Sequence, residues 1–210
     1  MLPVVTFLHL LVAASVMASQ APPKDLFSQI YQNAAARRDS IHSIRARFTE
    51  ITTSSLLEKP LVAHGTVVAA PPGRVLMTYS DPERRTIALD GRSLVIVWPD
   101  RHEREKMDIS QIQKRIDRYF TQANPEQLRS MFDIRAEPDA RMRGADLIDM
   151  RPKRKQIKEG LERLALWIDR ERSLLVQMQM TFPGGDKKTI ALDDIALNVP
   201  IADDTFEIRP

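Results

Sequence analysis

The sequence predicts an α+β protein built on one large antiparallel sheet with helices on one side. Three observations lead to this fold class. Apolar and polar residues alternate with a period of two through most of residues 44–98 and again after residue 145. Short turn signals separate these stretches, which favours sequential hairpins and antiparallel order. Two helical patterns interrupt the strands, one before residue 44 and one between residues 109 and 132.

Composition limits the classes of function. The chain has 210 residues, which suits one domain or at most two, and 43% of them are apolar. Charged residues make up 28% of the chain, but the net charge is only +3. The surface therefore carries charges of both signs, which argues against a basic surface for binding nucleic acid. The isoelectric point near 9.3 still permits an anionic membrane surface or an acidic partner. No cysteine is present, which excludes disulfides, zinc–thiolate sites and thiol catalysis.

The N-terminus has the pattern of an export signal. Residues 3–18 form an apolar run that is short for a bilayer span and ends in Val16-Met17-Ala18, a small-x-small cleavage pattern. The α-amino group of Met1 is the only positive charge before this run, so an uncleaved anchor is the alternative. We expect residues 1–18 to be a signal peptide cleaved near Ala18, and residues 19–210 to be one domain that is exported across the inner membrane.

The first elements are a helix and a long strand. Asp25 is the expected N-cap, and the apolar residues that follow recur on one helical stripe: Leu26, Phe27, Ile30, Tyr31 and Ala34. The period then changes to two, because Ile44, Ala46 and Phe48 alternate with polar residues. This alternation predicts a strand with one solvated face.

Turn signals then define successive hairpins. In "GTVVAAPPGRVLMTYSDP", Pro71 and Pro72 end one strand because neither can donate to a ladder, and Gly73 allows the reversal. Asp90-Gly91 predicts a two-residue turn that sets Ile87 opposite Leu94 and Leu89 opposite Arg92. One face of these two strands then holds Ile87, Leu89, Leu94, Ile96 and Trp98.

A helical insert follows a charged edge strand at residues 100–109. Its first helix carries an apolar stripe of Ile109, Ile112, Ile116, Tyr119 and Phe120. A second helix has Asn124 at the cap, Pro125 at the first position and Gln127 three residues after the cap, and it ends near Phe132. Strands are expected again at residues 145–152, 161–169, 174–182 and 187–195, with Met178, Met180 and Phe182 on one face.

Catalytic and metal-binding patterns are weak throughout. The histidines of the predicted mature chain stand on separate segments without i,i+4 partners, which argues against a metal site. No glycine-rich phosphate loop and no G-x-S-x-G elbow occurs. Asp193-Asp194 and Asp203-Asp204 are adjacent pairs, so on a strand their side chains would point to opposite faces. The sequence therefore predicts neither an enzyme nor a bound metal or cofactor.

Once catalytic and metal-binding patterns are set aside, the remaining notable feature of the sequence is its apolar side chains. Six methionines are spread over the strands and the insert, at positions 77, 107, 131, 150, 178 and 180. Methionine is flexible and polarizable, so it suits cavities that must fit variable guests. Ordinary core filling is the alternative, and periodicity alone favours it.

From Leu26 to Pro210 the chain resembles LolA, the periplasmic outer-membrane lipoprotein carrier, and its superfamily. The pieces that carry the resemblance, in order, are the N-terminal helix, "IRARFTE", "GTVVAAPPGRVLMTYSDP", "IALDGRSLVIVWP", "RPK" before a strand, "LALWID" and the ending "DDIALNVPIADDTFEIRP". Each piece alone is weak, whereas their order over nearly the whole predicted mature chain is specific.

This resemblance implies an unclosed β-barrel, a strongly curved antiparallel sheet whose helices form a lid over the concave face. It also implies a monomer that shuttles acylated lipoproteins, received from a LolCDE-type inner-membrane transporter and delivered to a LolB-type outer-membrane acceptor. The residues expected to line the lipid cavity are Phe48, Val67, Val75, Met77, Tyr79, Ile87, Leu89, Leu94, Ile96, Trp98, Met178, Met180 and Phe182. The residues expected on the lid are Ile109, Ile112, Ile116, Phe120, Leu128 and Met131.

The sequence departs from the family pattern at one position. Lipoprotein carriers commonly have an arginine just before the proline of an "RP" pair, where it ties the lid to the sheet. Here Ala70 and Pro71 precede Pro72, and Arg74 follows the turn. We therefore expect a lid that opens more readily than in carriers with that arginine.

Two other readings are kept beside the lipoprotein carrier. One is a LolA-like carrier of a different lipid, such as a glycolipid or an aryl-polyene-type ester. The other is a lipid-sensing regulator that binds a membrane-bound signalling protein, which usually needs a further domain. The fold alone does not choose among them, because the superfamily shares it.

Overall fold

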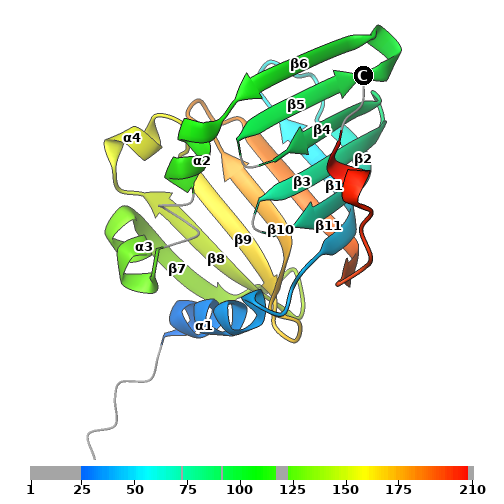
Figure 1. Cartoon of the computed structure of the whole chain (residues 1–210). Coiled ribbons are helices and arrows are strands. Elements are labelled where there is room, and N and C mark those ends of the chain that lie inside the picture. Colours follow the sequence, from blue (N-terminus) through cyan, green and yellow to red (C-terminus); the bar gives the residue numbers. More distant parts are fainter. Residues whose placement is uncertain (1–24, 72, 91, 117–122, 208–210) are drawn as a thin grey trace, which may run out of the picture.

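The computed structural model describes residues 25–71, 73–90, 92–116 and 123–207, and these form an α+β fold around an open antiparallel sheet (Figure 1). The sheet has eleven strands in the order β6-β5-β4-β3-β2-β1-β11-β10-β9-β8-β7. Their bounds are β1 Ile44–Thr53, β2 Leu61–Ala70, β3 Arg74–Asp81, β4 Arg85–Leu89, β5 Ser93–Trp98, β6 Glu103–Asp108, β7 Phe132–Pro138, β8 Ala145–Pro152, β9 Arg163–Asp169, β10 Leu174–Thr181 and β11 Lys187–Leu197.

Two meanders make up this sheet. Strands β1 to β6 pair in sequence order, and so do β7 to β11. The first strand of the first meander, β1, pairs antiparallel with the last strand of the second, β11. The sheet is not closed, so β6 and β7 are its two edges (Figure 1). The segment between residues 109 and 131 therefore connects one edge of the sheet to the other.

The helices begin where the sequence predicts. In α1 (Leu26–Arg38), the Asp25 carboxylate accepts from the Ser28 amide at 3.3 Å. Helix α2 covers Ser110–Ile116, and α3 covers Pro125–Met131. The capping box that opens α3 is confirmed, because Asn124 and Gln127 each accept from the other's backbone amide. The described residues contain no helix long and apolar enough to cross a membrane.

Three short helical turns complete the elements. The basic run after Arg151 contains the one-turn helix α4 (Lys155–Lys158). The 3-10 turn η1 (Pro99–Arg101) joins β5 to β6, and η3 (Asp203–Phe206) lies near the C-terminus.

Two sequence expectations were wrong or incomplete. Strand β7 was not predicted, although Phe132, Ile134 and Ala136 alternate with charged residues; the pattern is short and follows a helix directly. The turn between β4 and β5 is also displaced, since Leu89 pairs with Leu94 and Ile87 with Ile96.

The displaced turn has a local cause. The Asp90 carboxylate accepts from the amides of Arg92 and Ser93 at 3.0 and 2.7 Å, so Asp90 occupies the first position of the turn. The Asp90 amide in turn donates to the Ser93 carbonyl. Because the register differs from the expected one by two residues, the same side chains still share one face.

The core has two parts on one face of the sheet. The larger part packs α1 and α3 against β7, β8 and β9, with Phe27, Leu128, Met131, Phe132 and Met150 all buried. The smaller part centres on Phe48 and Tyr79, whose rings meet edge to face with centroids 4.8 Å apart. We call the face that carries both parts the inner face, because α1 and α3 pack on it.

Gly65 on β2 permits the smaller core to close. A Cβ at this position would lie 2.2 Å from the Thr78 carbonyl oxygen and 2.6 Å from the Phe48 ring. The close approach of strand backbone to a buried ring therefore requires glycine here.

We predict that Gly65→Ala lowers the free energy of unfolding by about 1–3 kcal/mol, because backbone and a buried ring must both shift. Chemical denaturation measures the difference. Gly160→Ala is the control, since a Cβ there meets nothing within 4 Å. Equal stability of Gly65→Ala and the unchanged protein would show that the Phe48 packing is wrongly placed.

Candidate functional site

Strand register assembles apolar rows on the inner face of β1 to β5. One row runs across the strands through Leu94, Leu89, Val75, Ala69 and Ile44. The next row contains Ile96, Ile87, Met77, Val67 and Ala46. Cross-strand neighbours of this kind lie about 4.5–5.5 Å apart, so each row is a continuous apolar band.

The two halves of the inner face are covered to different degrees. On β7 and β8 the inward side chains are mostly buried beneath α1 and α3. On β3, β4 and β5 the inward residues Val75, Met77, Ile87, Leu94 and Ile96 are only half-buried. The protein thus keeps a broad apolar surface that its own described elements do not seal.

The structure brings most of the expected cavity residues onto this one face. Phe48 and Tyr79 are buried in the smaller core, and Val67, Met77 and Ile87 pack against them. Met178 and Met180 lie in the other half, packed against the larger core. Val75, Leu89, Leu94, Ile96 and Trp98 complete the set on β3, β4 and β5 by their place in the strand alternation. Phe182 follows the end of β10 and is paired to no neighbouring strand.

The expected lid residues fall into two groups. Leu128 and Met131 on α3 are buried in the larger core, beside β7. Ile109 is also buried, and its amide donates to the Arg92 carbonyl at the β4–β5 turn. The side chains of Ile112 and Ile116, and all of Phe120, lie outside the described part of the chain.

A charged cluster interrupts the apolar inner face, and sequence reasoning missed it. Glu50 on β1 is buried, with 5% of its surface exposed. Its carboxylate accepts from the Tyr79 hydroxyl and from the Lys188 ammonium, each at 2.9 Å. The Arg85 guanidinium lies 3.8 Å from the same carboxylate and 3.9 Å from the centroid of the Tyr79 ring. A signal existed, because Glu50, Arg85 and Lys188 each stand two residues from an inward apolar side chain.

The cluster leaves one polar atom unsatisfied. The Nε of Arg85 is buried and has no hydrogen-bond partner in the described structure. Burial raises the pKa of the Tyr79 hydroxyl above its usual value, so Tyr79 stays neutral and its hydroxyl donates a hydrogen bond to Glu50. Two cations thus share one buried anion.

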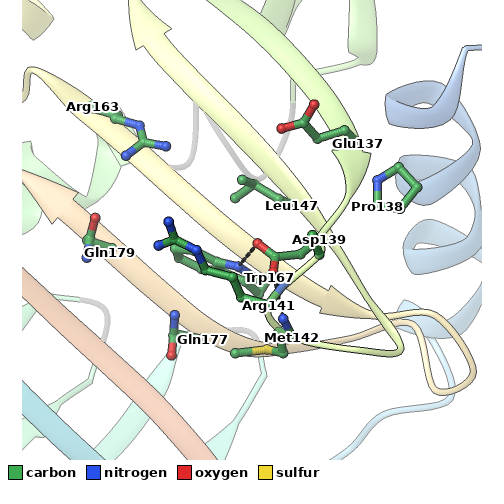
Figure 2. A pocket seen from close by; sticks show the side chains of 11 residues that line it. Glu137, Pro138, Asp139, Arg141, Met142, Leu147, Arg163, Trp167, Gln177 and Gln179 are labelled. Carbon is green, nitrogen blue, oxygen red and sulfur yellow. Dashed lines mark hydrogen bonds between the residues drawn. The ribbon is translucent and has the colours of Figure 1, made fainter.

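The opposite, outer face carries a hollow of about 760 Å³ with a mixed polar and apolar lining (Figure 2). The Trp167 indole donates to the Asp139 carboxylate at 2.9 Å, and this hydrogen bond together with one from the Met142 amide lowers the pKa of Asp139. Arg163, Gln177 and Gln179 also line the hollow. Apolar side chains, including Met142, Leu147 and Trp167, line this hollow together with the charged and amide groups.

The Arg74 side chain packs against the C-terminal turn η3. Its guanidinium lies 4.8 Å from the centroid of the Phe206 ring on η3. It therefore contacts the C-terminal segment. Within the described ranges, no group of three histidine or acidic side chains is placed to hold a metal ion.

The fold and the apolar inner face suit a protein that binds lipids or lipoproteins. Residues 39–209 match the family described as "Outer membrane lipoprotein carrier protein LolA", and the chain belongs to this family. No curated protein sequence matches the chain.

Solved structures share the fold at low sequence identity. An uncharacterized conserved protein from Thermus thermophilus aligns with a TM-score of 0.55 and 12% identity, over 86% of this chain and 94% of that one. The Mycobacterium tuberculosis lipoprotein LppX gives 0.51 and 12%, over 83% and 96%. MucB in the Pseudomonas aeruginosa MucA/MucB complex gives 0.51 and 16%, over 87% of this chain and 61% of MucB.

Proposed function

We propose that this protein is a periplasmic carrier that holds acyl chains on the inner face of its sheet and shuttles lipoproteins from the inner to the outer membrane. A LolCDE-type transporter would load it, and a LolB-type acceptor would unload it. Family membership supports the carrier class. The observation that carries the proposal is the pair of apolar rows on β1 to β5, whose inward side chains on β3, β4 and β5 stay only half-buried.

The energetics favour an acyl guest on these rows. Fully burying one Val, Leu, Ile or Met side chain is worth roughly 1.5–3 kcal/mol. Five half-buried inward residues, at positions 75, 77, 87, 94 and 96, therefore leave several kcal/mol of burial to be gained. An acyl chain can supply that burial without needing any directional contact.

The lid belongs to the same proposal. The segment from residue 109 to 131 joins the two sheet edges, and its α3 end packs on the inner face. In the empty protein its apolar stripe would rest on the sheet, and acyl chains would take the place of the sheet on loading. Opening then exchanges one apolar contact for another, so its free-energy cost can be small.

A carrier of a different lipid is the second candidate. The observation that favours it is the missing arginine before Pro72, together with the engagement of Arg74 by Phe206. A latch of one or two hydrogen bonds would contribute only about 0.5–1.5 kcal/mol each, so its loss loosens the lid without abolishing it.

We predict that Met77→Asp abolishes acyl binding, because it places an unpaired charge among acyl chains at a cost of several kcal/mol. Displacement of a fluorescent fatty acid measures the affinity. Thr78→Asp is the matched control, since Thr78 is the next residue on β3 and faces the other, exposed side. A folded Met77→Asp protein with unchanged affinity would mean that the acyl chains do not bind on this face.

We further predict that an acyl lipid changes the hydrogen-exchange protection of residues 108–116, because the lid segment moves from sheet to lipid. Pro71→Arg should raise protection of the empty protein if an arginine there can tie the lid down. Protection that is the same with and without lipid in both proteins would show that this segment is ordinary core.

A further inference from the structure

The charged cluster on the inner face has an imbalance that the fold does not explain. Glu50 contributes one negative charge, and Lys188 and Arg85 contribute two positive charges around it. Buried ionic groups persist when they are paired and fully hydrogen-bonded. The Glu50 carboxylate accepts two hydrogen bonds and is well paired. The cluster nevertheless carries two positive charges against one negative charge.

Both cations keep access to a ligand. The Lys188 side chain is 34% exposed and the Arg85 side chain 26%, against 7% for Glu50. The buried Nε of Arg85 has no hydrogen-bond partner in the part of the chain that is described. Buried polar groups in native proteins almost always have a hydrogen-bond partner, so this N–H is a donor available to a ligand.

The cluster also lies beside the apolar rows. Tyr79 pairs with Arg85, and the adjacent inward pair along the same two strands is Met77 with Ile87. Two residues along a strand span about 6.6–6.8 Å. An acyl chain that lies on the rows with its polar end toward Tyr79 would bring that end within reach of the two cations.

We propose that Arg85 and Lys188 bind an anionic group, a phosphate or a carboxylate, at the polar end of the acyl-chain cargo. The proposal rests on the carrier function above, because the group is the one attached to the acyl chains. The planar guanidinium of Arg85 suits two parallel hydrogen bonds to such an anion, and the Lys188 ammonium adds a point charge. Glu50 and the neutral Tyr79 hold the two cations in place.

The test compares two amphiphiles with the same chain. Binding of 1-palmitoyl lysophosphatidate and of uncharged 1-palmitoylglycerol to the full chain is measured by displacement of a fluorescent fatty-acid ester. We expect the acidic lipid to bind about tenfold tighter or more, the value of one additional charge-assisted hydrogen bond. Inorganic phosphate alone is the third arm: weak or absent competition identifies the lipid headgroup as the source, whereas competition at low concentration identifies a free-phosphate site.

Adjacent residues supply matched controls. Arg85→Gln and Lys188→Gln should each reduce the preference for the acidic lipid and leave affinity for palmitoylglycerol unchanged. Arg84→Gln and Lys187→Gln remove the same charges one residue away, where Arg84 pairs with Asp100 at the surface and Lys187 is exposed, and should change neither affinity. Thermal unfolding reports whether each variant is folded, and Lys188→Gln decides the question if Arg85→Gln does not fold.

The outcomes separate the two proposals. If neither lipid binds the unchanged protein, the carrier function fails. If both bind with equal affinity, the carrier function stands and the headgroup site is wrong. If Arg85→Gln and Lys188→Gln weaken both lipids equally, the cluster is a structural support of the inner face and does not recognise an anion.

Discussion

The pairing of β1 with β11 is the interaction on which the rest of the structure depends. It joins the first strand of the protein to the last, and so converts two separate meanders into one sheet. Side chains strengthen the join: Lys188 reaches Glu50, Arg47 reaches Asp194 at 2.6 Å, and the Ser43 hydroxyl donates to the Val199 carbonyl. Without this join the inner face would not be continuous, and its two cores would belong to different sheets.

A sheet that stays open exposes two edge strands with unpaired backbone groups, and this sheet also has one apolar face to cover. The β6 edge is charged and exposed along its whole length, which discourages pairing with another chain. Helices α1 and α3 seal the face near β7, while the face near β3 to β5 stays half-covered. The uneven cover is the physical basis for a carrier: one half holds the fold together, and the other half has apolar area to offer a guest.

Local signals predicted most of the fold, whereas the charged cluster that was missed depends on a contact between distant residues. Asn124, Pro125 and Gln127 specify the start of α3 within four residues, so the sequence alone sufficed there. The β4–β5 register depended on whether Leu89 or Asp90 occupies the first position of the turn, which hydrogen bonds from the Arg92 and Ser93 amides to the Asp90 carboxylate decided. The Glu50–Lys188 contact joins residues 138 positions apart, and no spacing rule links them. Their inward placement could have been read only after β1 and β11 were known to be neighbours.

Native mass spectrometry of protein purified gently from the periplasm tests the carrier account most directly. The account predicts a population heavier than the chain by one acylated molecule, whose fragmentation releases fatty acids. Protein stripped of that molecule should regain the added mass when it is incubated with an acyl lipid. The mass of the bare chain alone, both on purification and after incubation with excess acyl lipid, would contradict the claim that the inner face carries acyl chains.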